Sequence, residues 1–92
     1  MYFDWDPRKA KSNARKHSLS FEEAATVFYD PLAATFDAPD HSDEERRFIT
    51  VGYSSRNHLC IVVHIEREGA LRIISARQAT AQERKRHEEG TK

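Results

Sequence analysis

Short runs of alternating hydrophobic and polar positions dominate the second half of the chain. This alternation, with many β-branched and aromatic residues, is typical of strands that bury one face. The predicted strands of this half are 46–54, 58–66 and 70–77. Connections of three residues join them, which is a hairpin length. Two more short strands are predicted earlier, at 2–6 and 32–36.

Helix-start signals flank these strands. An Asp before a Pro, or a Ser or Thr followed three residues later by Glu, suits the first turn of a helix. The pairs are Asp6 with Pro7, Ser20 with Glu23, and Thr80 with Glu83. They predict helices at 7–17 and 81–89 and, between these, one that Pro31 ends. The apolar positions of the first two helices are Ala10, Ala14 and His17, then Phe21, Ala24, Ala25 and Phe28.

The element order βααββββα predicts an α+β fold. We expect an antiparallel sheet of four to five strands, packed by two N-terminal helices and one C-terminal helix. A length of 92 residues predicts a single domain, 1–92, with a modest core. Segment 58–66 is apolar on both sides, which predicts a central strand covered on both faces. Within it, Cys60 is expected to be a buried hydrophobe and His64 a hydrogen-bonded core residue.

Charge is balanced in total and uneven along the chain. The formal net charge is +0, yet 1–17 and the segment from Arg46 onward are basic, whereas 37–45 is an acidic, turn-rich loop. Basic and acidic faces are therefore expected. The single cysteine excludes a disulfide within the chain, and no run approaches the roughly 20 apolar residues of a membrane span. These features predict a cytoplasmic protein without membrane contact.

Metal and nucleotide chemistry have little support. The histidines show neither HxH nor HxxxH spacing and no cysteine pair accompanies them, so no metal or cofactor is expected. A nucleophile-elbow serine and glycine-rich phosphate loops are also absent from the sequence.

Nucleic acid is the polyanion that separate basic segments can bind. A ribonuclease without metal needs a base, an acid and fixed cations around the phosphate. His17 is the natural proton-transfer group, because histidine titrates near neutral pH. Its place at the end of a helix also favours a plain capping role, since an imidazolium interacts well with the helix dipole.

Arg72 and Arg77 stand within and at the end of an otherwise apolar strand. Both are permanently charged, so they either reach water at the strand ends or face an anion-binding cleft. An odd spacing sends two side chains of a regular strand to opposite faces. The two arginines can serve one site only if the strand bends, bulges or ends before Arg77.

Three linked segments, FDWDPRKAKSNARKHSLSFEEAATVFYDP, ERRFITVGYSSRN and RIISARQATAQERKRHEE, resemble the BrnT toxins of type II toxin–antitoxin systems. The resemblance implies a RelE-like ribonuclease fold and an endoribonuclease that cleaves RNA and halts translation. Without a metal, cleavage is expected to proceed by attack of the 2′-hydroxyl. It also implies a DNA-binding BrnA-type antitoxin that neutralises the toxin and, in complex with it, binds its own promoter.

On the positions that match the family's motifs, the expected catalytic residues are Lys16, His17, Arg72 and Arg77. His17 is expected as acid or base, Lys16 and Arg77 as stabilisers of the transition state, and Arg72 with Arg47 as backbone clamps. The substrate-binding set is Lys11, Arg46, Arg47, Ser75 and Arg84. An alternative from another class remains open: a non-catalytic basic module that binds an antitoxin or nucleic acid.

Overall fold

The computed structural model describes residues 1–38 and 45–90, so most of the predicted acidic loop 37–45 lies outside the described residues. The predicted element order is confirmed, with a 3-10 turn, η1, after the second helix. The elements are β1 (Tyr2–Asp4), α1 (Pro7–His17), α2 (Phe21–Ala25), η1 (Thr26–Tyr29), β2 (Ala34–Asp37), β3 (Phe48–Tyr53), β4 (Leu59–Arg67), β5 (Ala70–Gln78) and α3 (Ala81–Gly90).

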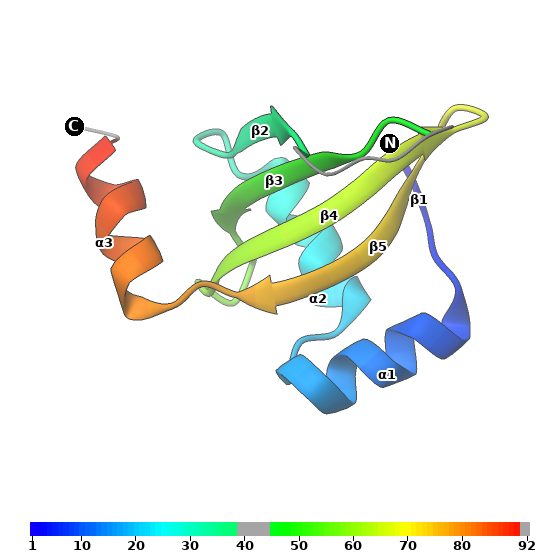
Figure 1. The fold of residues 1–92 in the computed structure, drawn as a ribbon, viewed down its shortest axis with the longest axis horizontal. Helices are drawn as coiled ribbons and strands as arrows, with labels where there is room; N and C mark the ends of the chain where they lie inside the picture. The colour runs from blue at the N-terminus through cyan, green and yellow to red at the C-terminus, as the bar shows by residue number, and fades with distance from the viewer. Residues whose placement is uncertain (39–44, 91–92) are drawn as a thin grey trace.

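In the described part of the chain the strands form one five-stranded sheet in the order β1-β5-β4-β3-β2 (Figure 1). β4 is central, as predicted. Strands β2 to β5 pair antiparallel, whereas β1 pairs parallel with β5. The sheet is therefore mixed rather than purely antiparallel. Parallel pairing requires a long crossover, and the chain makes one because α1 and α2 follow β1 directly.

Helices α1 and α2 pack against one face of the sheet, which we call the helix face (Figure 1). Its core joins helix residues such as Phe21 to Cys60 and Val62 of β4, all fully buried. We call the opposite side the open face, because Ile61 and Val63 there are only half-buried. The prediction that β4 is covered on both faces is wrong at these two residues. The third helix, α3, has no buried residue of its own and leaves Ile61 and Val63 partly exposed.

The predicted helix starts are confirmed by their hydrogen bonds. Asp6 Oδ1 accepts a bond from the backbone N–H of Arg8 at 2.9 Å, and Ser20 Oγ accepts one from Glu23 at 3.0 Å. At the start of α3, Thr80 and Glu83 exchange two bonds, at 2.9 and 3.1 Å. Each bond satisfies an N–H group that the helix itself leaves unpaired.

The buried position of α1 is Asn13, which the apolar pattern does not predict. Of the expected apolar face, Ala10 is half-buried, but Ala14 and His17 are exposed, so that expectation is wrong for both. Asn13 is buried because its side chain forms hydrogen bonds with the backbone of β5. The Asn13 amide donates to Ala76 O at 2.8 Å and accepts from Ala76 N at 3.1 Å. Since β1 covers β5 only from Ala70 to Arg72, Asn13 occupies a stretch of free strand edge.

Two predictions about core residues of β4 are confirmed. Cys60 is fully buried, and burial raises the pKa of its thiol to about 11. His64 is 4% exposed, and its Nε2 lies 2.7 Å from Thr50 Oγ1. Burial lowers the pKa of His64 to about 4, so the ring is neutral at physiological pH. Both residues therefore belong to the core rather than to a reactive site.

Candidate functional site

A bulge in β5 brings Arg72, Ser75 and Arg77 to one face of the sheet. Before the bulge Arg72 lies opposite Ile65, and after it Ser75 and Arg77 lie opposite Val63 and Ile61. The three partners are alternate residues of β4 and share its open face. The register shifts by one residue between these pairs, which turns the odd spacing of the arginines into a shared orientation. The condition predicted for a common site is met.

Arg77 is held by a carboxylate of α3. Its two terminal nitrogens donate to Glu83 Oε1 and Oε2 at 2.8 and 2.9 Å, in bidentate geometry. The hydrogen bonds from Arg77, with those from Thr80, lower the pKa of Glu83 to about 2. Glu83 is therefore ionised throughout the physiological range. It occupies the fork that a phosphate would otherwise bind.

Arg72 is also paired, at the other end of the open face. Its Nη1 donates to Asp4 Oδ2 in β1, a residue far away in the sequence. Close by, Arg67 donates two hydrogen bonds to Glu45 at 2.7 and 3.1 Å. The pKa of Glu45 is lowered, mainly by its bond from Arg67, with smaller effects of Arg47 and Arg72. Arg47, Arg67 and Arg72 thus gather near one end of the sheet.

Arg46 lies apart from these three arginines, although the sequence predicted that it binds substrate together with Arg47. It forms a bidentate pair with Asp37 at 3.0 Å and lies 5.3 Å from the ring centre of Phe48. Phe48 in turn stacks on buried His64, so Arg46 lies on the side of the helix face. Neighbouring residues of an extended chain point to opposite sides, which explains why Arg46 and Arg47 diverge.

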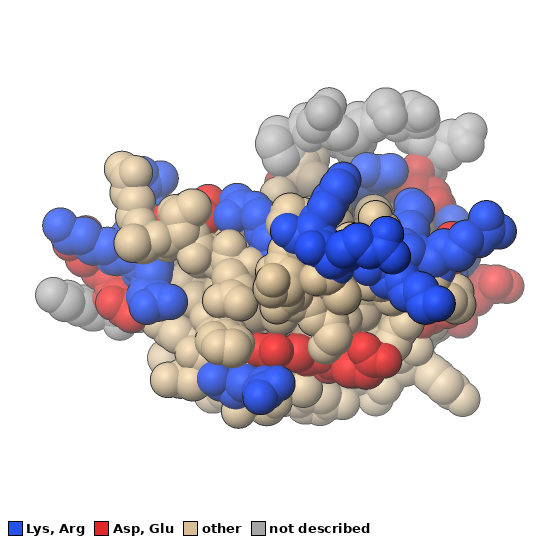
Figure 2. Space-filling view, turned by 90° about the horizontal axis from the view of Figure 1, so that it is seen from below, with Lys and Arg blue, Asp and Glu red and all other residues tan. Residues whose placement is uncertain are grey.

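Helix α1 carries cations that form no ion pair within residues 1–38 and 45–90. Figure 2 shows Lys and Arg side chains gathered in a broad band over α1, and a second group over α3 at the far end. The cations of α1 are Arg8, Lys9, Lys11, Arg15 and Lys16, all exposed. Arg84 is exposed on α3, next to Lys85 and Arg86. These charges are available to an incoming polyanion.

Lys16 and His17 lie near the edge of β5 on the side of the helix face, whereas Arg72 and Arg77 point to the open face. Asn13 touches the backbone of Ala76, and His17 follows one helical turn later. In Figure 1, α1 ends below the C-terminal end of β5, the strand that carries Arg77. The His17 side chain is exposed, and in the described part of the chain no hydrogen bond or ion pair links it to the sheet. A bound substrate would have to bridge these groups.

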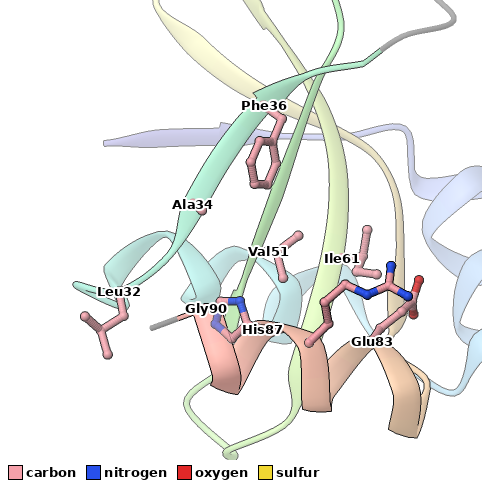
Figure 3. A pocket seen from close by; sticks show the side chains of 9 residues that line it. Leu32, Ala34, Phe36, Val51, Ile61, Glu83, His87 and Gly90 are labelled. Carbon is pink, nitrogen blue, oxygen red and sulfur yellow. The ribbon is translucent and has the colours of Figure 1, made fainter. Parts of the chain in front are cut away.

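A groove of about 410 Å³ lies between the open face and α3. Figure 3 shows Phe36, Val51 and Ile61 of three neighbouring strands on one side, with Glu83 and His87 of α3 on the other. Sequence reasoning missed this groove. The available signal was the α3 sequence, which lacks an apolar stripe and therefore cannot cover the apolar residues of the open face.

A second polar cluster is structural. Glu23 accepts hydrogen bonds from Ser54 Oγ at 2.6 Å and pairs with His58 Nδ1 at 2.8 Å. Burial alone would raise the pKa of Glu23, but these hydrogen bonds hold it below its ordinary value. The serine donates to the glutamate rather than to the histidine, so the histidine does not activate it as a nucleophile. The cluster fastens the β3–β4 turn to α2.

The described residues form neither a cluster of metal ligands nor a membrane-spanning helix. Across residues 1–38 and 45–90, no group of three or more His, Cys, Asp or Glu side chains is arranged to hold a metal ion. Among the helices of the same residues, none combines the length and the apolar character that crossing a membrane requires.

The fold and site define a class: a small α+β protein with a basic helix packed on one face of a sheet whose opposite face carries several arginines. Residues 5–83 match the family described as "Ribonuclease toxin, BrnT, of type II toxin-antitoxin system", and the chain belongs to this family. The resemblance seen in the sequence is thereby confirmed. A ribonuclease toxin of this type acts on RNA and has an antitoxin partner.

A solved structure supports the fold. The crystal structure of the Brucella abortus ribonuclease toxin, BrnT, matches with a TM-score of 0.64 and 24% identity, over 87% of this chain and 97% of that chain. The α+β architecture of the described residues, with three α-helices and a five-stranded sheet, is therefore that of a BrnT toxin. No curated protein matches the chain.

Proposed function

We propose that this protein is a metal-independent endoribonuclease whose site is the part of the open face that carries Arg72, Ser75 and Arg77. The observation that supports this most is the bulge, which gives the three side chains one orientation. Two guanidinium groups and a hydroxyl can bind phosphate oxygens without a metal ion.

The reaction needs one proton removed and one supplied. The RNA 2′-oxygen attacks the adjacent phosphorus, the bond to the 5′-oxygen breaks, and a 2′,3′-cyclic phosphate remains. His17 carries out one of these two transfers, removing the 2′-hydroxyl proton or protonating the leaving 5′-oxygen, and solvent water carries out the other. Arg77 and Lys16 stabilise the extra negative charge of the transition state. Arg72 and Arg47 clamp the flanking backbone, and Ser75 donates a hydrogen bond to the phosphate.

The exposed cations of α1 supply long-range attraction for the RNA backbone. Lys11 and its neighbours are free of ion pairs in the described part of the chain, and Arg84 offers a further charge on α3. Single-stranded RNA is the form that fits, because its backbone can follow a curved protein surface. Binding should therefore weaken steeply with added salt.

In the cell we propose that cleavage of RNA in the cytoplasm halts translation. A BrnA-type antitoxin neutralises the toxin, and the complex binds the promoter of its own genes. The support is membership of a type II family, in which toxin and antitoxin act as a pair. This chain supplies the toxin.

A non-catalytic binding module is the second candidate, and one observation favours it. The sheet arginines Arg46, Arg67, Arg72 and Arg77 are each paired with a carboxylate, which weakens their hold on a phosphate. A nuclease must release Arg77 from Glu83 when RNA binds, whereas a module that binds through α1 need not.

One assay separates the candidates. The purified protein is incubated with an end-labelled single-stranded RNA in the presence of a chelator. Fragments that end in 2′,3′-cyclic phosphate support the ribonuclease. Binding without cleavage supports the module, and cleavage that the chelator stops contradicts the metal-independent mechanism.

A further inference from the structure

The groove between the open face and α3 has a floor of apolar residues. Val51 and Ile61 are register partners on β3 and β4, and both are half-buried. Phe36 on the edge strand β2 forms one wall, and its side chain is 55% exposed. On the opposite wall, the His87 ring lies 6.0 Å from that of Tyr53, edge to face. The groove therefore offers flat apolar surfaces that are open to solvent.

The groove adjoins the proposed catalytic arginine. Ile61 in its floor is also the register partner of Arg77, and facing residues of paired strands lie close together. Glu83 lines the groove and holds the Arg77 guanidinium. A ligand that fills the groove is therefore next to the position where a phosphate would meet Arg77.

We propose that this groove seats an unpaired nucleobase of the RNA whose phosphate binds at Arg77. The inference rests on the proposed ribonuclease function. A nucleobase is flat and apolar on its faces, and proteins bind unpaired bases by stacking them on aromatic rings. Phe36 and His87 supply such rings, and Val51 with Ile61 supply the floor.

The polar groups of the groove favour a base over a protein segment. They are Glu83, Arg86 and His87, all on α3, and Glu83 binds Arg77 directly. A nucleotide is apolar at the base and anionic at the phosphate, so it matches an apolar floor bordered by arginines. The volume of about 410 Å³ is also that of a small-molecule site rather than of an extended interface.

The decisive experiment follows the methyl signals of Val51 and Ile61 by NMR. The probe is a single-stranded hexanucleotide with 2′-O-methyl groups, which cannot be cleaved, and the control is an abasic sugar-phosphate oligomer of equal length. The base-containing probe should shift both methyl signals and the abasic one neither. Equal shifts with both probes, or none with either, would overturn the proposal.

A matched pair of variants tests the stacking. Phe36→Ala should weaken binding of the hexanucleotide by about tenfold, because base stacking on an aromatic ring contributes about that much. Tyr29→Ala removes an aromatic side chain that is 66% exposed and lies outside the groove, and should leave affinity unchanged. Circular dichroism checks that both variants are folded. Equal affinities of the two variants would contradict the proposal that the groove binds a nucleobase.

These outcomes are separate from those of the cleavage assay. Methyl shifts without cleavage of ordinary RNA would support the base seat and refute the ribonuclease. Cleavage by a Phe36→Ala variant of unchanged affinity would leave the ribonuclease standing and remove the base seat. A Phe36→Ala variant that keeps RNA affinity but escapes neutralisation by its antitoxin would assign the groove to a protein partner and overturn the proposal.

Discussion

Arg72 and Arg77 lie on the same face of the sheet, although a regular strand would send them to opposite faces. Opposite them stand Ile65 and Ile61 of β4, and the one-residue shift of register between these pairs accounts for the shared orientation. The bulge is thus the local irregularity that turns the RIISAR segment into one side of a site. The proposed chemistry depends on it.

Replacing Arg77 tests the centre of that site. Arg77→Ala should lower the rate of RNA cleavage by about 10²- to 10³-fold, which is typical of losing one group that stabilises transition-state charge. Growth inhibition should be lost with it. Arg56→Ala, which removes an exposed arginine of the β3–β4 turn, is the control and should cleave at the wild-type rate. Equal rates of the two variants would remove Arg77 from the mechanism.

Glu83→Gln tests whether the carboxylate competes with RNA for Arg77. Glutamine retains the size of the side chain and removes the charge, so the guanidinium becomes available to a phosphate. Because an exposed ion pair contributes up to about 1 kcal/mol, RNA affinity should rise several-fold. A fluorescence titration measures this, and an unchanged affinity would mean that the pair only fastens α3.

The pH dependence of this competition follows from the pKa of Glu83. The pKa of Glu83 is lower in the folded protein than its ordinary value of 4.5, so the ionised carboxylate stabilises the fold at any pH above 4.5. This stabilisation is lost as the pH falls toward about 2. The pair should therefore persist from pH 8 down to about pH 4. Any gain in RNA affinity within that range must come from another group.

Most helix starts could be predicted from the sequence because they depend on neighbouring residues. Asp6, Ser20 and Thr80 each cap a helix within three residues of their own position. The pair between Arg72 and Asp4 could not be predicted, since it joins residues that only the parallel pairing of β1 with β5 brings together. Short-range signals are visible in a single sequence, and long-range pairs are not.

The sequence predicted which residues belong to the candidate site but not how they are arranged in space. Arg72, Ser75 and Arg77 were expected from one segment, but whether they share a face depended on a bulge that the sequence left open. The apolar pattern also misplaced the buried side of α1. Hydropathy does not show that Asn13 satisfies the free edge of β5, because that role comes from hydrogen bonds.

Asn13 is expected to be a major stabilising residue. Asn13→Ala would leave the N–H and C=O of Ala76 without partners in a buried position, and each unpaired group costs about 1 to 3 kcal/mol. The free energy of unfolding, measured with urea, should fall by about 2 to 6 kcal/mol. The exposed neighbour in Ser12→Ala serves as control and should change it by less than about 0.5 kcal/mol. A loss below 1 kcal/mol at Asn13 would contradict this role.

His64 should make stability depend on pH. Its pKa falls from 6.5 to about 4 on folding because burial disfavours the charged ring, so the unfolded chain binds the proton more readily. Its stabilisation is complete above pH 6.5 and is lost as the pH falls toward 4, by up to about 3 kcal/mol. Urea titrations of the wild type and His64→Gln should diverge between these limits. Parallel curves would refute the assignment, since the other histidines are common to both proteins.

His17 is the group whose role depends most on a bound substrate, because it is exposed and, within residues 1–38 and 45–90, forms no hydrogen bond or ion pair with the sheet arginines. If it transfers a proton, His17→Ala should lower kcat by about 10²- to 10⁴-fold with little change in RNA affinity. Lys16→Ala changes the neighbouring residue on the same helix, and added imidazole should restore cleavage to His17→Ala but not to Lys16→Ala. If His17 only caps α1, its loss would lower the stability of the fold and leave kcat unaltered.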